Sequence, residues 1–319
     1  YTGSAFGLWL IFSTFFALHL PTALHGVYGR YNALINNELY IVLFFLVATM
    51  PIDTGRISRI TGLFVFALIP VSLYAVLQYL NVDFFPWPSG RSASTIGNPV
   101  ILGAVLSLGF PFALVFFLRY RSNNAKIFWG AIILLMLIAM FTTISRGPAL
   151  SVVISSAIIF LINRKEGRKD FKRIMLFIIP VLLLLTVFIV SSPASLEKIG
   201  QRLKDISNLK TDRNIQVRLV YYKAALDSIK EYPIVGVGLE SFRIVYPRYR
   251  PVQEGQARDV IPTMVHNGYL QLALTNGIPA LILYLLFLSA VFVVFLRKVR
   301  RTSEPVVRLI MSGFIGMAT

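Results

Sequence analysis

Residues 127–163 read IFWGAIILLMLIAMFTTISRGPALSVVISSAIIFLIN, and Arg146 is the one charged side chain among them. A bilayer with a hydrocarbon core about 30 Å thick needs roughly 20 apolar residues in each helix that crosses it. The stretch offers two such runs, at 127–145 and 148–163, with almost no loop between them. It therefore predicts two membrane-spanning helices joined by a tight turn that contains Arg146.

The rest of the chain has the same character. Hydrophobic residues make up 56% of the 319 and charged residues 14%, whereas a soluble domain carries about 25% charged residues. Six further spans and an incomplete ninth are expected at 4–22, 36–52, 60–80, 99–118, 174–191, 268–296 and 306–319. The composition predicts an all-α polytopic membrane protein with about nine visible transmembrane helices. Because the chain starts without Met and stops within an apolar run, we expect further helices beyond one or both of its ends.

Basic residues indicate the orientation of these spans. The short loops at 51–59, 119–126, 163–173 and 297–305 together carry 15 Lys and Arg. The short loops between them carry only Arg30, Arg91 and Arg146. Since cytoplasmic loops collect Lys and Arg, we place the four basic loops in the cytoplasm. Much of the net charge of +17 then reflects membrane topology, and we expect no nucleic-acid partner.

One long polar segment, residues 192–265, interrupts the apolar pattern on the opposite, non-cytoplasmic side. We expect three regions: transmembrane helices 1–7 over 1–191, this extracytoplasmic loop over 192–265, and the C-terminal transmembrane helices over 266–319. A long loop in a compact protein usually has a function. The loop is therefore the first place to look for an active site.

The loop contains a predicted amphipathic helix that begins near Asp212 and ends before Pro233. Its apolar residues recur at intervals of three and four and form one stripe. The stripe consists of Ile215, Leu219, Tyr222, Leu226 and Ile229. Such a helix would lie on the membrane surface or cover a cavity.

Three basic residues on the non-cytoplasmic side are candidates for chemistry. Two guanidinium groups, from Arg146 and Arg218, could clamp a phosphate or diphosphate. A neutral imidazole at His266 could accept a proton from an attacking hydroxyl. Each residue also has a plain structural interpretation: Arg146 could reach lipid head groups, Arg218 could face solvent, and His266 could start a helix. Close approach of the three side chains would favour an enzyme.

Metal chemistry finds little support in the sequence. The chain contains no Cys, and it has no Asp-x-Asp motif or paired carboxylates at the outer interface. We therefore predict a metal-independent transfer that uses no cofactor.

Five motifs occur in an order that resembles the O-antigen ligase/polymerase superfamily of bacterial membrane glycosyltransferases. The resemblance covers roughly residues 85–296. The motifs are Arg91–Pro99 (RSASTIGNP), Thr143–Gly147 (TISRG), Arg218–Gly238 (from RLVYY to GVG), Tyr246–Tyr249 (YPRY) and His266-Asn267. Each motif alone is weak, whereas five in this order on a matching topology are fairly specific.

The resemblance implies a GT-C-like helix bundle whose donor is a glycan linked to undecaprenyl diphosphate. Arg146 and Arg218 correspond to the diphosphate-binding arginines of the family, and His266 to its essential histidine. Displacement at the anomeric carbon would invert its configuration. Arg91, Asn98, Arg248 and Asn267 would support the site. The family implies a location in the cytoplasmic (inner) membrane, among membrane lipids, with the active site on the periplasmic or extracytoplasmic face.

The acceptor stays open at this point, because lipid A core, a second lipid-linked glycan, a protein side chain or another polymer would all fit. An O-antigen ligase, a Wzy-type polymerase of O-antigen or polysaccharide, and a protein O-oligosaccharyltransferase are therefore all compatible with the sequence. The chain departs from common family residues at Ser94, Val100, Thr275, Asn276 and Ala280, which weakens the case for a lipopolysaccharide ligase. A transporter or flippase and a structural membrane scaffold are alternatives of other classes.

Overall fold

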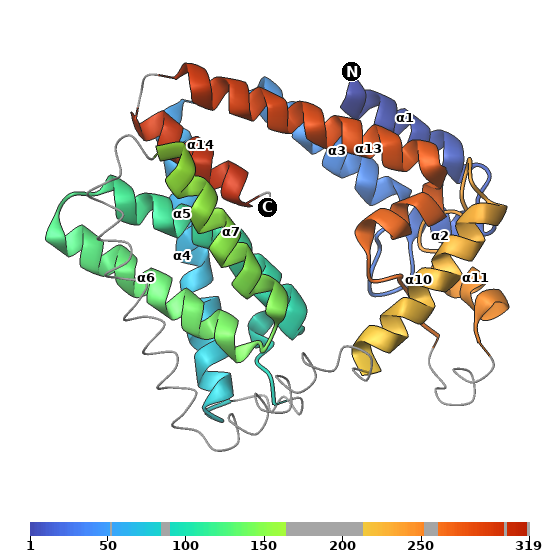
Figure 1. Cartoon of the computed structure of the whole chain (residues 1–319), viewed down its shortest axis with the longest axis horizontal. Helices are drawn as coiled ribbons and strands as arrows, with labels where there is room; N and C mark the ends of the chain where they lie inside the picture. Colours follow the sequence, from blue (N-terminus) through green and yellow to red (C-terminus); the bar gives the residue numbers. More distant parts are fainter. Residues whose placement is uncertain (52, 84–89, 164–212, 252–260, 303–304, 318–319) are drawn as a thin grey trace. The chain divides into compact units, whose positions relative to one another are not determined.

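The computed structural model describes residues 1–51, 53–83, 90–163, 213–251, 261–302 and 305–317, and all regular structure in these ranges is helical (Figure 1). Four helices are long and apolar enough to cross a membrane: α4 (Thr54–Tyr79), α5 (Pro99–Arg119), α6 (Asn123–Thr142) and α13 (Gly268–Arg301). These helices confirm a helical membrane protein. The count of about nine spans stays a prediction, and the span expected at 174–191 lies outside the described residues.

The chain divides into two compact units. Unit 1 comprises Tyr1–Pro51 and Glu197–Val293, and unit 2 comprises Ile52–Leu196 and Val294–Thr319. These units follow contacts within the fold. The predicted regions 1–191, 192–265 and 266–319 follow membrane topology, and they stay a prediction.

Unit 2 is a helix bundle built around α5. This helix contacts α4, α6, α7 (Arg146–Asn163), α14 (Pro305–Met317) and the short 3-10 helix η1 (Ser94–Ile96). Its core includes the fully buried Leu102, Leu106 and Met136. A Cβ added at Gly109 would lie 2.2 Å from the Cδ1 of Leu68, so glycine lets α5 approach α4 closely. Small residues at helix contacts are typical of membrane bundles.

Unit 1 contains α1 (Thr2–Thr14), α2 (Leu20–His25), α3 (Leu34–Thr49), α10 (Arg213–Glu231), α11 (Phe242–Tyr249) and the first part of α13. The single span expected at 4–22 is wrong, because α1 ends at Thr14 and α2 begins at Leu20. The side chain of His19 caps α2 by accepting a hydrogen bond from the backbone N–H of Thr22. Pro21 fits the first turn of α2. Because proline has no backbone N–H, it could not donate the hydrogen bond that would continue a helix from α1.

Helix α13 is broken at Gly277, whose backbone has φ 82° and ψ 169°. A Cβ at this position would lie 1.7 Å from the carbonyl oxygen of Ile234, so only glycine fits. After the break, the N–H of Ile278 donates to the carbonyl of Pro233 at 2.8 Å. The break therefore seats α13 on the turn that follows α10.

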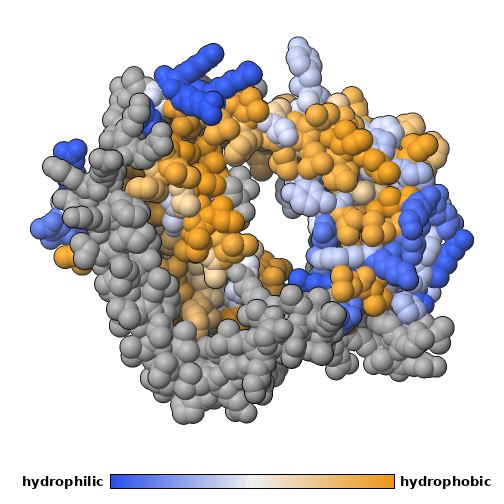
Figure 2. Space-filling view, in the orientation of Figure 1, coloured by the Kyte–Doolittle hydropathy of each residue, from blue (hydrophilic) through white to orange (hydrophobic). Residues whose placement is uncertain are grey.

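Large apolar side chains face outward on both units (Figure 2). Examples are Leu43 on α3, Leu63 on α4 and Leu286 on α13, all of which are exposed. Lipid would cover such surfaces in a membrane protein, where water would leave them unfavourably hydrated.

Candidate active site

In unit 2, a turn of three residues between α6 and α7 leads directly into Arg146, the first residue of α7. Thr142 and Thr143 are fully buried, and their hydroxyls donate to the carbonyls of Ala139 and Met140 at 2.8 and 2.7 Å. Ile144 adopts a left-handed backbone with φ 48°. The structure thus confirms a tight turn, but the turn comprises residues 143–145, and Arg146 begins α7 instead of lying within the turn.

Arg91 holds this turn from the preceding loop. Its Nε donates to the carbonyl of Thr143 at 2.8 Å, and its Nη2 donates to the hydroxyl of Ser145 at 3.0 Å. The side-chain oxygen of Gln78 accepts from the backbone N–H groups of Ala93 and Ser94, at 2.7 and 2.9 Å. Gln78 on α4 therefore holds the loop that carries Arg91. Arg91 thus holds the turn that directly precedes Arg146, and its predicted supporting role stays a prediction.

Asn98 and Asn267 are both helix caps. The Oδ1 of Asn98 accepts from the N–H groups of Val100 and Ile101 at the start of α5. The Oδ1 of Asn267 accepts from the N–H groups that begin α13, at 3.0 and 3.1 Å. Capping satisfies backbone donors that a helix leaves unpaired. Both residues, predicted as supporting, act here through the backbone that they cap.

In unit 1, His266 lies directly before α13 with a left-handed backbone of φ 62°. Two neighbouring contacts hold this conformation. The N–H of Val265 donates to the Oε1 of Gln271 at 2.8 Å, and the hydroxyl of Tyr222 donates to the carbonyl of His266 at 3.3 Å. Left-handed backbone is uncommon outside glycine and persists where the surroundings determine it. These contacts fix the backbone position from which the His266 side chain projects.

The imidazole of His266 stacks on the ring of Tyr221, with centroids 6.1 Å apart and planes 20° apart. His266 is an exposed residue, but partial loss of hydration around the ring lowers its pKa. The positive charge of Arg218 lowers the pKa of His266 further, and that of Arg30 does so as well. A lowered pKa keeps the imidazole neutral at working pH, as a proton acceptor requires.

The structure divides the predicted apolar stripe of α10 between two environments. Ile229 is buried within the protein, whereas Leu219 and Leu226 are 51% and 47% exposed. The buried face instead contains Tyr221, Ala224, Ala225, Ser228 and Ile229. It packs against Phe242, Val245 and Tyr246, where the two alanines permit close approach. The helix ends before Pro233 as predicted, while Asp212 lies outside the described residues.

Arg248 binds a partner at the end of α10. Its Nη1 lies 2.6 Å from the Oε1 of Glu231, and the hydroxyl of Tyr249 donates to the Oε2 of the same carboxylate at 2.6 Å. These contacts fasten α11 to α10. Arg248 therefore supports unit 1 by packing its helices together.

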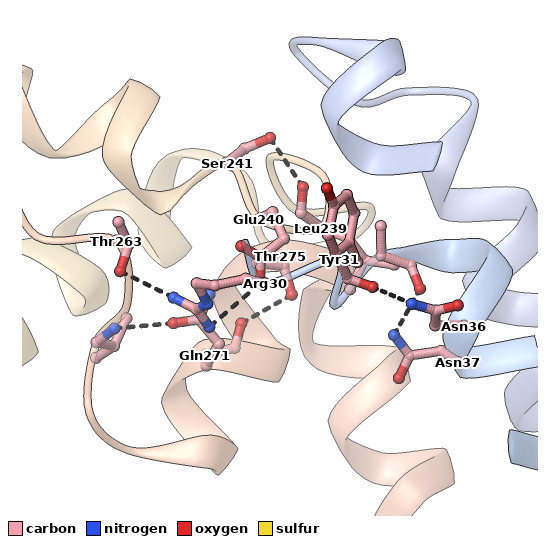
Figure 3. A network of polar contacts seen from close by, with 12 residues as sticks. Arg30, Tyr31, Asn36, Asn37, Leu239, Glu240, Ser241, Thr263, Gln271 and Thr275 are labelled. Atoms are coloured by element: carbon pink, nitrogen blue, oxygen red, sulfur yellow. Dashed lines mark hydrogen bonds and ion pairs between the residues drawn. The ribbon is translucent and has the colours of Figure 1, made fainter. Parts of the chain in front are cut away.

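Sequence reasoning missed a third group near His266. Arg30, between α2 and α3, contacts Glu240 and Thr263 (Figure 3). The sequence marks Arg30 only as a basic residue of a short outer loop. That position was itself a signal, because basic residues are rare in the short loops on that side of the chain.

The structure brings Arg218 and His266 into one electrostatic environment within unit 1. Arg146 belongs to unit 2, so the convergence of the three residues stays a prediction. Among the residues that the structure describes, no group of three or more His, Asp or Glu could hold a metal ion. The candidate groups themselves are guanidinium and imidazole, which can bind anions and move protons.

The spans and the Arg-and-His site define a helical membrane protein with features suited to an anionic substrate. A family model described as O-antigen ligase matches residues 131–285, from α6 into α13. This match supports the resemblance to the O-antigen ligase/polymerase superfamily found in the motifs. No curated protein matches the chain significantly.

Proposed function

We propose that the chain is an O-antigen ligase-like glycosyltransferase at the outer face of the cytoplasmic membrane. It takes a glycan from undecaprenyl diphosphate and transfers it to an acceptor hydroxyl. The observation that carries this proposal is the environment of His266: a histidine with a lowered pKa, stacked on Tyr221 and close to the charge of Arg218. A neutral base beside a guanidinium is what attack on a diphosphate-linked sugar needs.

In the proposed reaction, His266 accepts the proton of the acceptor hydroxyl as its oxygen bonds to the anomeric carbon. The bond from that carbon to the diphosphate oxygen breaks, and its electron pair leaves with undecaprenyl diphosphate. Attack from the opposite side inverts the configuration. Arg146 and Arg218 stabilise the charge that grows on the diphosphate, since planar guanidinium groups bind phosphate oxygens in pairs.

A transfer assay with purified protein tests this function. The protein is incubated with a lipid-linked oligosaccharide and three acceptors in parallel: lipid A core, a second lipid-linked glycan and a hydroxyl-containing peptide. We expect a product whose mass equals acceptor plus glycan, formed at the same rate with and without chelator. Absence of product with every acceptor, or strict dependence on an added divalent metal, would contradict the proposal. The acceptor that reacts distinguishes ligase, polymerase and protein glycosylation.

A further inference from the structure

We infer that Arg30 is a positioning residue for His266, because its guanidinium joins the buried carboxylate of Glu240 to the segment that carries the histidine. This inference rests on the proposed function, in which His266 accepts the proton. All of the residues concerned belong to unit 1.

Arg30 makes two contacts in different directions. Its Nη2 lies 3.3 Å from the Oε1 of Glu240, and its Nη1 donates to the hydroxyl of Thr263 at 2.9 Å (Figure 3). A guanidinium is planar and presents its donors in a rigid fork, so it fixes two partners at once. Arg30 therefore sets the distance between the Glu240 turn and Thr263, which lies three residues before His266.

Glu240 provides a firm anchor for Arg30. Its side chain is only 4% exposed, and its backbone is left-handed with φ 57°. Burial raises the pKa of Glu240, and the charge of Arg30 opposes that rise. The Oε2 of Glu240 accepts no hydrogen bond from the part of the chain that the structure describes. Because a buried carboxylate needs compensation, the pair resists separation and holds Arg30 in place.

The segment from Thr263 to His266 is tied at two points. Thr263 binds Arg30, and the fully buried Val265 donates its N–H to Gln271 on α13. Without the contact between Arg30 and Thr263, the left-handed backbone of His266 would be held only by the contact of Val265 with Gln271 and by Tyr222. A displacement of about 1 Å can reduce a rate 100-fold, so the tie matters for proton transfer.

Arg30 also contributes its charge to the surroundings of the imidazole. Among the residues that the structure describes, Tyr221 stacks on His266, Tyr222 donates to its carbonyl, and Arg218 and Arg30 act on it through their charge. Both arginines favour the neutral imidazole. Arg30 lies outside the matched segment 131–285 and is separated from Thr263 by 233 positions. The N-terminal part of the chain therefore contributes to the candidate site.

Two sets of variants separate positioning from charge. Thr263→Val removes the hydroxyl that Arg30 binds while keeping every charge, and Thr263→Ser is its matched control. Arg30→Gln combined with Glu240→Gln removes both members of the ion pair, so that no buried charge is left alone. Glu240→Gln by itself retains Arg30 and is the control for that double variant.

The kinetic readout is transfer from a lipid-linked oligosaccharide, with kcat and KM measured separately. The second readout is the titration of His266 by NMR in protein labelled with 13C-histidine. The chain contains three His, and the His266 signal is the one missing from a His266→Ala sample. This titration does not require activity.

We expect Thr263→Val to lower kcat about 10- to 100-fold with little change in KM, and Thr263→Ser to stay near wild type. We expect the double variant to lower kcat and to show a higher pKa at His266 than Glu240→Gln does. Wild-type kcat in both Thr263→Val and the double variant, with equal pKa values in the double variant and its control, would overturn the inference. If His266→Ala still transfers at the wild-type rate, the proposed role of His266 fails, and this inference fails with it.

Discussion

Unit 1 and unit 2 hold their candidate residues by different kinds of contact. In unit 2, Arg146 follows a three-residue turn between two apolar helices, and Arg91 closes that turn through a backbone carbonyl and a serine hydroxyl. In unit 1, His266 depends on side chains that come from α10, α13 and the loop before α3. The first arrangement combines a local turn with one arginine from the preceding loop, whereas the second is assembled from several distant parts of the chain.

This difference has a consequence for substitutions. A turn closed mainly by one arginine tolerates changes that keep that arginine. A histidine held by several side chains is sensitive at each of them. We therefore expect effects of different sizes in the two units, and the variants below follow from the largest to the smallest.

The largest effect is expected for His266→Ala. A positioned general base contributes about 100- to 10,000-fold to a rate, so transfer should fall by at least that lower factor. Binding of the lipid-linked donor should change little, because the alanine leaves both candidate arginines in place. Product mass in the transfer assay and donor binding by the same protein provide the two measurements. Wild-type transfer by this variant would remove His266 from the mechanism.

Next come Arg146→Lys and Arg218→Lys, one in each unit. An ammonium keeps the charge but cannot make the paired hydrogen bonds of a guanidinium. A charge-assisted hydrogen bond contributes about 1.5–3 kcal/mol, so each variant should lose about 10- to 100-fold in kcat/KM. Matched controls are Arg121→Lys in unit 2 and Arg243→Lys in unit 1, both at exposed positions. Full activity in both test variants would argue against a diphosphate clamp.

A smaller effect is expected for Arg91→Gln, which loses the hydrogen bonds to Thr143 and Ser145. Because Arg91 acts on the turn before Arg146, we expect about a tenfold loss of transfer. The free energy of unfolding should fall by about 1–3 kcal/mol. Transfer assays and thermal unfolding in detergent measure the two effects. A loss of stability without any loss of transfer would limit Arg91 to a structural role.

The apolar pattern predicted helices in both units, but it did not predict how unit 1 assembles around His266. Two apolar runs on either side of Arg146 predict both helices and the turn, because lipid leaves few alternatives for such sequences. The contact of Arg30 with Thr263 joins residues 233 positions apart, and no local pattern encodes it. Proximity of this kind arises from packing, which the sequence of either segment alone does not specify.

The stripe of α10 shows a second limit of sequence patterns. Leu219 and Leu226 follow helical periodicity but are exposed, while Ala224 and Ala225 are buried. In a membrane protein, large apolar residues can face lipid as readily as they face the protein interior. Small residues mark the close helix contacts instead. The alanines were therefore the better guide to the buried face of this helix.

The smallest effect concerns pH. The pKa of His266 is lowered by partial burial first, and then by the positive charges of Arg218 and Arg30. The neutral imidazole is the active form, so transfer should persist to a lower pH than an ordinary histidine, with a pKa near 6.5, would allow. Arg218→Gln removes a positive charge and so eases protonation of the imidazole. The pKa of His266 should therefore rise, and the acid limb of residual transfer should move to higher pH.

The same titration can be followed by NMR of 13C-labelled histidine, with Arg243→Gln as the control on unit 1. Arg243 is exposed on α11, and it is not among the groups that shift the pKa of His266. An equal pKa in wild type and Arg218→Gln would mean that the charge of Arg218 does not reach the imidazole. In that case Arg218 and His266 would not share one electrostatic environment. His266 would then be the one candidate residue of unit 1 left in the proposed mechanism.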